Sequence, residues 1–125
     1  MGARINFVLK AYETEKAHVT LYSHWGETEW QSDLAVALDK ARPRWDDGSY
    51  GVRIVVSQLI NDDWDKPHGF GLFTSTDGEE FWDALVIVDF VNQTVTFDGN
   101  EQSFESFVEY QGDLMENHDF SAVTA

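Results

Sequence analysis

The chain has 125 residues, of which 42% are hydrophobic, and its formal net charge is −15 at pH 7. The length fits a single domain, and the hydrophobic content suffices for a buried core, which excludes a wholly disordered chain. The charge excludes general binding to nucleic acid or to an anionic membrane, and the lack of cysteine excludes disulfides and thiol chemistry.

Two strands are predicted at the start of the chain. Residues 4–10 place Ile5, Phe7 and Leu9 on one face at a period of two, and residues 18–22 place Val19 and Leu21 on one face, which is typical of strands with one buried face. The polar residues 11–17 between them predict a hairpin loop.

A helix is predicted next, because Thr28 and Gln31 have the spacing of a capping box and Pro43 is placed to end the helix. Hydrophobic residues recur between these signals at helical spacing and predict a buried stripe. The stripe consists of Trp30, Leu34, Ala37, Leu38 and Ala41.

Residues 49–61 fit two interpretations. Their hydrophobic residues match helical spacing with Ser49 as N-cap, whereas their β-branched content favours a strand. Strict alternation fails at residues 55–56 and again at 59–60, so we expect a helix.

Three more strands and a helix are predicted in the second half. Residues 69–73 form a short strand, and the hydrophobic run 84–90 predicts a central strand buried on both faces. Residues 94–97 return as an edge strand. A last helix is expected over 103–111, with Gly112 at its C-terminal end.

The element order ββααβββα predicts an α+β fold, a mostly antiparallel sheet of about five strands covered by two or three helices. There is no internal repeat and no linker, so we expect one domain over residues 1–112. Residues 113–125 lack periodicity and are expected to form a frayed acidic tail.

A candidate anion site follows the second predicted strand, at Ser23, His24 and Trp25. The N-terminus of a helix favours anions because its backbone N–H groups and dipole face them. Ser23 can donate a hydrogen bond, His24 can donate or carry charge, and Trp25 can stack on a base or sugar.

Arg42, Arg44 and Arg53 fall within twelve residues and offer guanidinium groups suited to phosphate or carboxylate, with Trp45 as a second stacking residue. Together with the Ser-His-Trp segment they predict a site for a nucleotide-like anionic small molecule. A structural interpretation stays open, in which Arg42 complements a helix dipole and Arg44 pairs with one of the aspartates 46–47.

We expect no catalytic or metal-ligating residue and no cofactor, which favours a binding protein over an enzyme. Adjacent residues of an extended segment point to opposite faces, so His24 is badly placed as a base for Ser23. Residues 62–68 hold three aspartates and a histidine, but their spacing matches neither an EF-hand nor a zinc site, and a solvated loop is favoured.

The acidic second half supports an alternative function. All eight Lys and Arg lie at or before Lys66, while residues 67–125 carry twelve carboxylates. Glu105 and Glu109 share a face of the last predicted helix. These residues suggest an acidic protein-blocking or nucleic-acid-mimic module that binds a basic host protein.

No stretch approaches the 18 or so hydrophobic residues of a membrane span, and residues 1–6 lack the hydrophobic region of a signal peptide. We therefore expect a cytoplasmic protein that contacts neither membrane nor nucleic acid directly. The sequence leaves homo-oligomerisation open.

Three strings, residues 1–7 (MGARINF), 21–26 (LYSHWG) and 42–45 (RPRW), resemble a group of small uncharacterised proteins of tailed bacteriophages. The likeness covers the first half best, through Tyr50 and Arg53, and fades across the acidic half. It implies a viral accessory protein in the host bacterial cytoplasm. Such proteins often act in anti-defence, by sequestering nucleotide signals or by blocking a host protein. The resemblance brings no catalytic residue with it.

Overall fold

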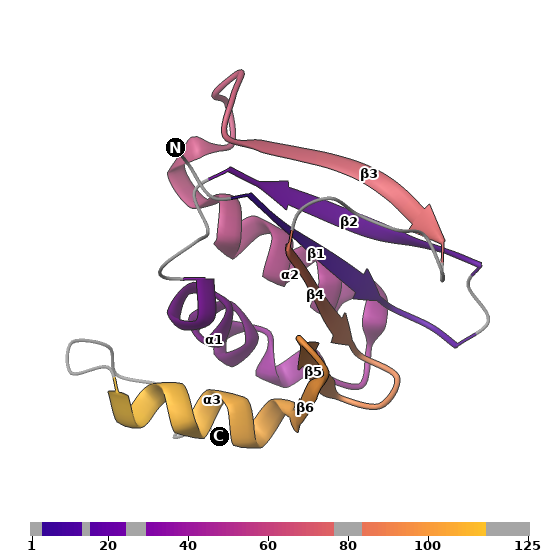
Figure 1. Ribbon diagram of the computed structural model, residues 1–125, viewed down its shortest axis with the longest axis vertical. Helices are drawn as coiled ribbons and strands as arrows, with labels where there is room; N and C mark the ends of the chain where they lie inside the picture. Colours follow the sequence, from indigo (N-terminus) through magenta and orange to yellow (C-terminus); the bar gives the residue numbers. More distant parts are fainter. Residues whose placement is uncertain (1–3, 14–15, 25–29, 77–83, 115–125) are drawn as a thin grey trace.

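Six strands and three α-helices are present in the part of the chain that this computed structural model describes, residues 4–13, 16–24, 30–76 and 84–114. The strands form one sheet, and the three helices lie on the same side of it (Figure 1). The expected α+β class is confirmed, with one strand more than the five or so predicted.

The strands are hydrogen-bonded in the order β3-β2-β1-β4-β5-β6. Their bounds are Ile5–Lys10 (β1), Ala17–Ser23 (β2), Phe70–Thr76 (β3), Ala84–Asp89 (β4), Thr94–Phe97 (β5) and Asn100–Ser103 (β6). Neighbouring strands are antiparallel except for β1 and β4, which are parallel. The sheet is therefore mostly antiparallel, as expected.

The helices are α1 (Trp30–Lys40), α2 (Gly48–Ile60) and α3 (Phe104–Leu114). Two short 3-10 helices, η1 (Arg42–Arg44) and η2 (Asn61–Asp63), follow α1 and α2. None of the helices in the described ranges is long and apolar enough to cross a membrane.

Strand β1 lies at the centre of the sheet and is buried on both faces. Its five residues from Ile5 to Leu9 are all buried, although the sequence predicted one buried face here. Burial on both faces was expected in residues 84–90 instead. In β4, however, Val86 and Val88 are buried while Ile87 between them is partly exposed. The alternation of side chains in a sequence shows only which of them are polar. Whether a strand is buried on one face or on both depends on its position in the sheet.

The whole predicted stripe is buried, with Ala41 just past the end of α1. Trp30 packs its ring edge-on against Phe7 of β1, with 6.2 Å between the ring centroids, so the stripe fixes α1 on the sheet. The predicted N-cap, Thr28, lies outside the described residues.

The predicted helix over 49–61 is confirmed as α2, which ends one residue earlier, at Ile60. The N-cap is Asp47 rather than Ser49, because its side chain accepts a hydrogen bond from the backbone N–H of Tyr50 at 3.5 Å. Helix α2 starts against the end of β1: a Cβ built on Gly48 would come within 2.7 Å of the Ala11 Cα.

Strand β6 was not predicted from the sequence. All four β6 side chains are exposed and polar, so no hydrophobic pattern marks the strand, which pairs with β5 through its backbone.

Helix α3 begins after Ser103, whose Oγ accepts a hydrogen bond from the backbone N–H of Ser106 at 3.0 Å. It continues through Gly112 to Leu114, so the predicted end at Gly112 is wrong. A glycine lowers helix propensity without ending a helix by itself. Of the expected tail 113–125, residues from 115 on lie outside the described residues.

Candidate functional site

Ser23 and the segment 42–47, which holds Arg42 and Arg44, lead to opposite ends of strand β1. Ser23 pairs with Ile5, at the start of the strand. The segment 42–47 leads into Gly48, which packs on Ala11, just past the end of the strand. Five steps of about 3.3 Å along β1 separate these ends by about 17 Å. This separation does not favour one site shared by Ser23 and the segment 42–47. Trp25 lies outside the described residues.

Ser23 and His24 are held by the sheet. Ser23 is buried, and the backbone N–H of His24 donates to the Gly69 carbonyl at 2.9 Å. The His24 Nδ1 lies 3.1 Å from the Tyr22 hydroxyl. These contacts close the end of β2 against the start of β3.

Arg42 joins α1 to α3. Its Nη1 donates to Glu105 Oε1 at 2.8 Å and its Nε to Asp39 Oδ1 at 3.4 Å. The guanidinium also lies over the Trp45 ring, 4.5 Å from its centroid. The Arg42 guanidinium thus contacts two carboxylates and an aromatic face. A phosphate ligand would have to compete with these partners for the guanidinium.

Arg44 pairs with Asp47 at 3.4 Å and lies 4.4 Å from the centre of the Tyr50 ring. The structural interpretation left open by the sequence therefore holds for Arg44. Arg53 is exposed on α2.

Trp45 is a core residue. Its Nε1 donates to the Leu38 carbonyl at 2.9 Å, and its ring meets Phe104 edge-on at 5.3 Å. The indole thus satisfies one of the last carbonyls of α1, which have no partner within the helix. Its burial leaves little ring surface for stacking on a ligand.

We expect Arg42→Ala to lower the free energy of unfolding by about 1–2 kcal/mol, because it removes the cation–π contact and both ion pairs. A double-mutant cycle with Glu105→Gln should assign only about 0.2–1 kcal/mol to the Arg42–Glu105 pair, since Glu105 is exposed. Urea denaturation measures both quantities. Arg53→Ala is the matched control, and an equal loss in both arginine variants would contradict the bridging role.

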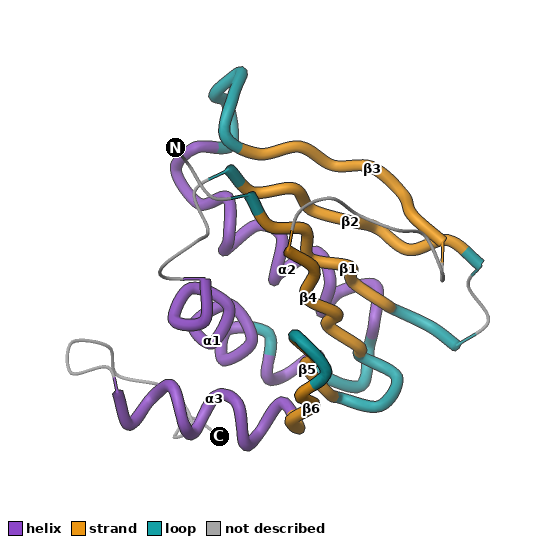
Figure 2. Tube along the Cα trace, in the orientation of Figure 1, coloured by secondary structure: helices purple, strands orange, loops and turns teal. Residues whose placement is uncertain are grey.

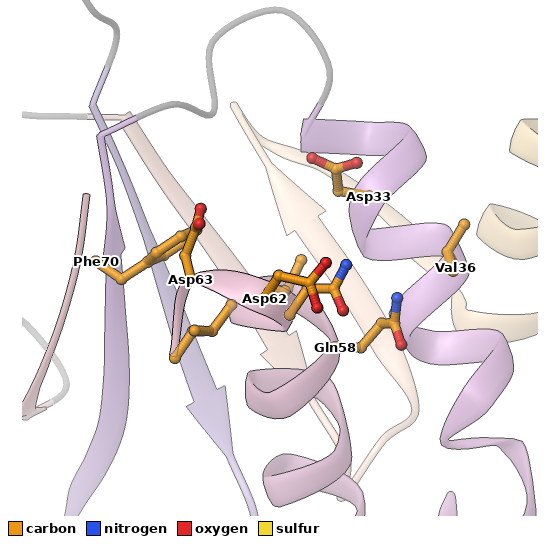
Figure 3. Close-up of a pocket in the computed structure, with 9 residues that line it drawn as sticks. Asp33, Val36, Gln58, Asp62, Asp63 and Phe70 are labelled. Carbon is orange, nitrogen blue, oxygen red and sulfur yellow. The ribbon is translucent and has the colours of Figure 1, made fainter. Parts of the chain in front are cut away.

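A cleft of about 600 Å³ lies between α1 and the end of α2 (Figure 3). Asp33 and Val36 on α1 form one wall, and Gln58 and Asp62 at the end of α2 and in η2 form the other (Figure 3). The remaining described lining residues are Leu59, Ile60, Asn61, Asp63 and Phe70.

The backbone at Asn61 places the aspartates beside this cleft. Asn61 has φ 49° and ψ −125°, a conformation with positive φ that asparagine tolerates better than most residues. It ends α2, and η2 then carries Asp62 and Asp63. The loop that follows extends beyond the start of β3 (Figure 2).

The cleft combines negative charge with hydrophobic surface. Asp33, Asp62 and Asp63 are the charged residues among its described lining, and it contains no Lys or Arg there. A concave surface lined by one sign of charge concentrates ions of the opposite sign. No metal-binding group of three His, Cys, Asp or Glu occurs in the described ranges. The cleft is therefore suited to a cation that carries a hydrophobic stem, such as a lysine or arginine side chain.

Sequence reasoning missed this cleft. It noted the aspartates of the 62–68 loop as a solvated acidic loop, but Asp33 and Phe70 come from other elements. Their meeting depends on how α1 packs against α2, and no local pattern reports that packing.

The acidic second half offers a row of carboxylates rather than a cavity. Glu105, Glu109 and Asp113 follow one another at intervals of four along α3, and all are exposed. Glu105 is paired with Arg42. The acidic residues between 77 and 83 lie outside the described residues.

Comparison of the chain with protein-family models, with curated proteins and with solved structures found no match.

Proposed function

We propose that this protein is a non-enzymatic binding protein whose acidic cleft holds a basic segment of a partner protein. The observation that carries the proposal is the cleft between α1 and α2, where three carboxylates border hydrophobic surface. This is the second of the two functions that the sequence suggested. Its contact surface is here the cleft and not the acidic second half of the chain.

The lining of the cleft supports a lysine or arginine side chain as its occupant. Val36, Leu59 and Phe70 can cover the aliphatic stem, and the carboxylates can accept hydrogen bonds from the charged end. The three carboxylates are exposed in the unbound protein. A bound partner withdraws them from water, and charge pairs across an interface fix the orientation of that partner.

A site for a small anion has less support. The guanidinium groups of Arg42 and Arg44 already contact carboxylates of the same chain. An anion would also approach against a net charge of −15.

The resemblance to phage accessory proteins supplies the setting of the proposal. The partner would be a basic protein of the bacterial host, met in the host cytoplasm, and binding would block it. Anti-defence is one activity that such blocking would serve.

The test is the affinity of the protein for a labelled peptide of ten alternating lysines and leucines, measured by fluorescence anisotropy. We expect the Asp62→Asn/Asp63→Asn double variant to bind about tenfold more weakly, a loss of about 1.4 kcal/mol. The affinity of the parent should also fall as salt rises, because the pairs are screened over about 8 Å at physiological ionic strength.

The matched control is Asp46→Asn/Asp98→Asn, which makes the same change in net charge at exposed positions away from the cleft. This control should lose less than about twofold in affinity. If both double variants lose the same amount, net charge alone attracts the peptide and the cleft is not its site.

A further inference from the structure

A second cavity, of about 190 Å³, lies between the start of α1, the end of α3 and the β5–β6 hairpin. None of its described lining residues is charged, although 25% of the chain is. Its lining divides into an aromatic part and a carboxamide part. The cavity is separate from the acidic cleft, so an inference about it does not depend on the function proposed above.

The aromatic part consists of Trp30, Phe97 and Phe107, one ring each from α1, β5 and α3. Trp30 and Phe107 are nearly parallel, with 15° between their planes and 6.3 Å between centroids. The Phe97 ring is tilted against Trp30 at 4.9 Å. Phe97 and Phe107 both pack on Trp30 and hold it in place. Trp30 and Phe107 are only 5% and 2% exposed, so the partly exposed Phe97 ring supplies the hydrophobic surface on this side of the cavity.

The carboxamide part consists of Gln31, Asn100, Gln102 and Gln111. None of these four side chains makes a hydrogen bond to another residue in the described part of the structure. Gln111 is 8% exposed, so this residue is largely withdrawn from bulk water. Buried amides without a partner are rare because they lose their hydrogen bonds to water and gain none.

We propose that this cavity binds an uncharged nitrogen heterocycle, a nucleobase presented as the free base or as a nucleoside. Each carboxamide carries a donor and an acceptor side by side, which is how Asn and Gln pair with the edge of adenine. The partly exposed Phe97 ring supplies the aromatic surface for the base, since bases stack on such rings.

The size and charge of the cavity restrict the ligand further. Its volume corresponds to about six water molecules, which is room for one ring system rather than for a whole nucleotide. No described lining residue could neutralise a phosphate. The base or nucleoside is therefore expected to bind more tightly than the nucleoside monophosphate.

The experiment is thermal unfolding of the full chain with adenine, guanine, cytosine and uracil, each as base, nucleoside and 5′-monophosphate, and with glucose and galactose. At a hundred times its dissociation constant, a bound base or nucleoside should raise the Tm on the order of 3–6 °C. No shift with any base or nucleoside, a shift with the sugars instead, or tighter binding of the monophosphate would overturn the proposal.

The variant Gln111→Met distinguishes ligand binding by the Gln111 amide from a contribution of that amide to stability. The variant keeps the side-chain volume but removes the polar group, so ligand affinity should fall at least tenfold while the Tm without ligand stays equal or rises. Gln102→Met tests the same cavity from a more exposed position, and Tyr110→Phe on the outer side of α3 is the unchanged control. Undiminished binding in Gln111→Met, or a lower Tm without ligand, would count against the proposal.

Discussion

Replacing Gly48 by alanine should lower the free energy of unfolding by about 3 kcal/mol. Glycine to alanine within a helix normally stabilises by about 0.5–1 kcal/mol, so the expected sign is reversed here. The reason is the close contact between the start of α2 and the end of β1, where a Cβ on residue 48 would come within 2.7 Å of the Ala11 Cα and of its carbonyl carbon. Both are backbone atoms, which cannot move aside as a flexible side chain can.

The matched control is Gly71→Ala in β3, where the nearest atom to an added Cβ is 4.0 Å away. This variant should stay within about 0.5 kcal/mol of the parent. Urea denaturation followed by circular dichroism gives both values. Equal stability of the two variants would mean that α2 can shift along β1 at little cost.

Replacing Trp45 by alanine should destabilise the protein by about 3–5 kcal/mol, as truncation of a buried tryptophan does. The change removes the edge-on contact with Phe104 and the face on which Arg42 lies. It also leaves the Leu38 carbonyl at the end of α1 without its donor. Trp45→Phe retains part of the ring packing and should lose about 1–3 kcal/mol, chiefly for the unpaired carbonyl.

The control for this series is Trp64→Ala, because Trp64 is 78% exposed and should change stability by less than about 0.5 kcal/mol. Chemical denaturation of the three variants ranks them. If Trp45→Ala proved as mild as Trp64→Ala, the indole would not be holding α1 to α3, and a ligand-stacking role would return.

The secondary structure was predictable where the hydrophobic residues of a segment recur at one spacing, either that of a helix or that of a strand. Residues 49–61 are the clearest case, since the pairs 55–56 and 59–60 break alternation and the segment is helical. The parallel pairing of β1 with β4 was not predictable, because it joins residues nearly eighty positions apart. Strand β6 was not predicted for a different reason. Its four residues are exposed and polar, so they show no alternation of hydrophobic and polar side chains.

The candidate sites were less predictable than the fold. Arg42 and Arg44 stand out in an acidic sequence, and their closeness suggested a common ligand. The structure gives each its own carboxylate partners. Conversely, Gln111 is one polar residue among many in the sequence, and its meaning depends on burial next to a cavity formed by three elements. The charges of side chains are visible in the sequence, whereas burial beside a cavity depends on the fold.

The place of β1 at the centre of the sheet also has a consequence during synthesis. β1 ends at Lys10 and its parallel neighbour β4 begins at Ala84, so at about 5–20 residues per second a ribosome needs about 4–15 s to bring out the second after the first. During that time β2 can pair with one edge of β1, while the other edge has no strand to receive it. The most buried strand of the mature sheet is thus the one that waits longest for its neighbour, and sheet closure is a late, long-range event of the kind that sets slow folding rates.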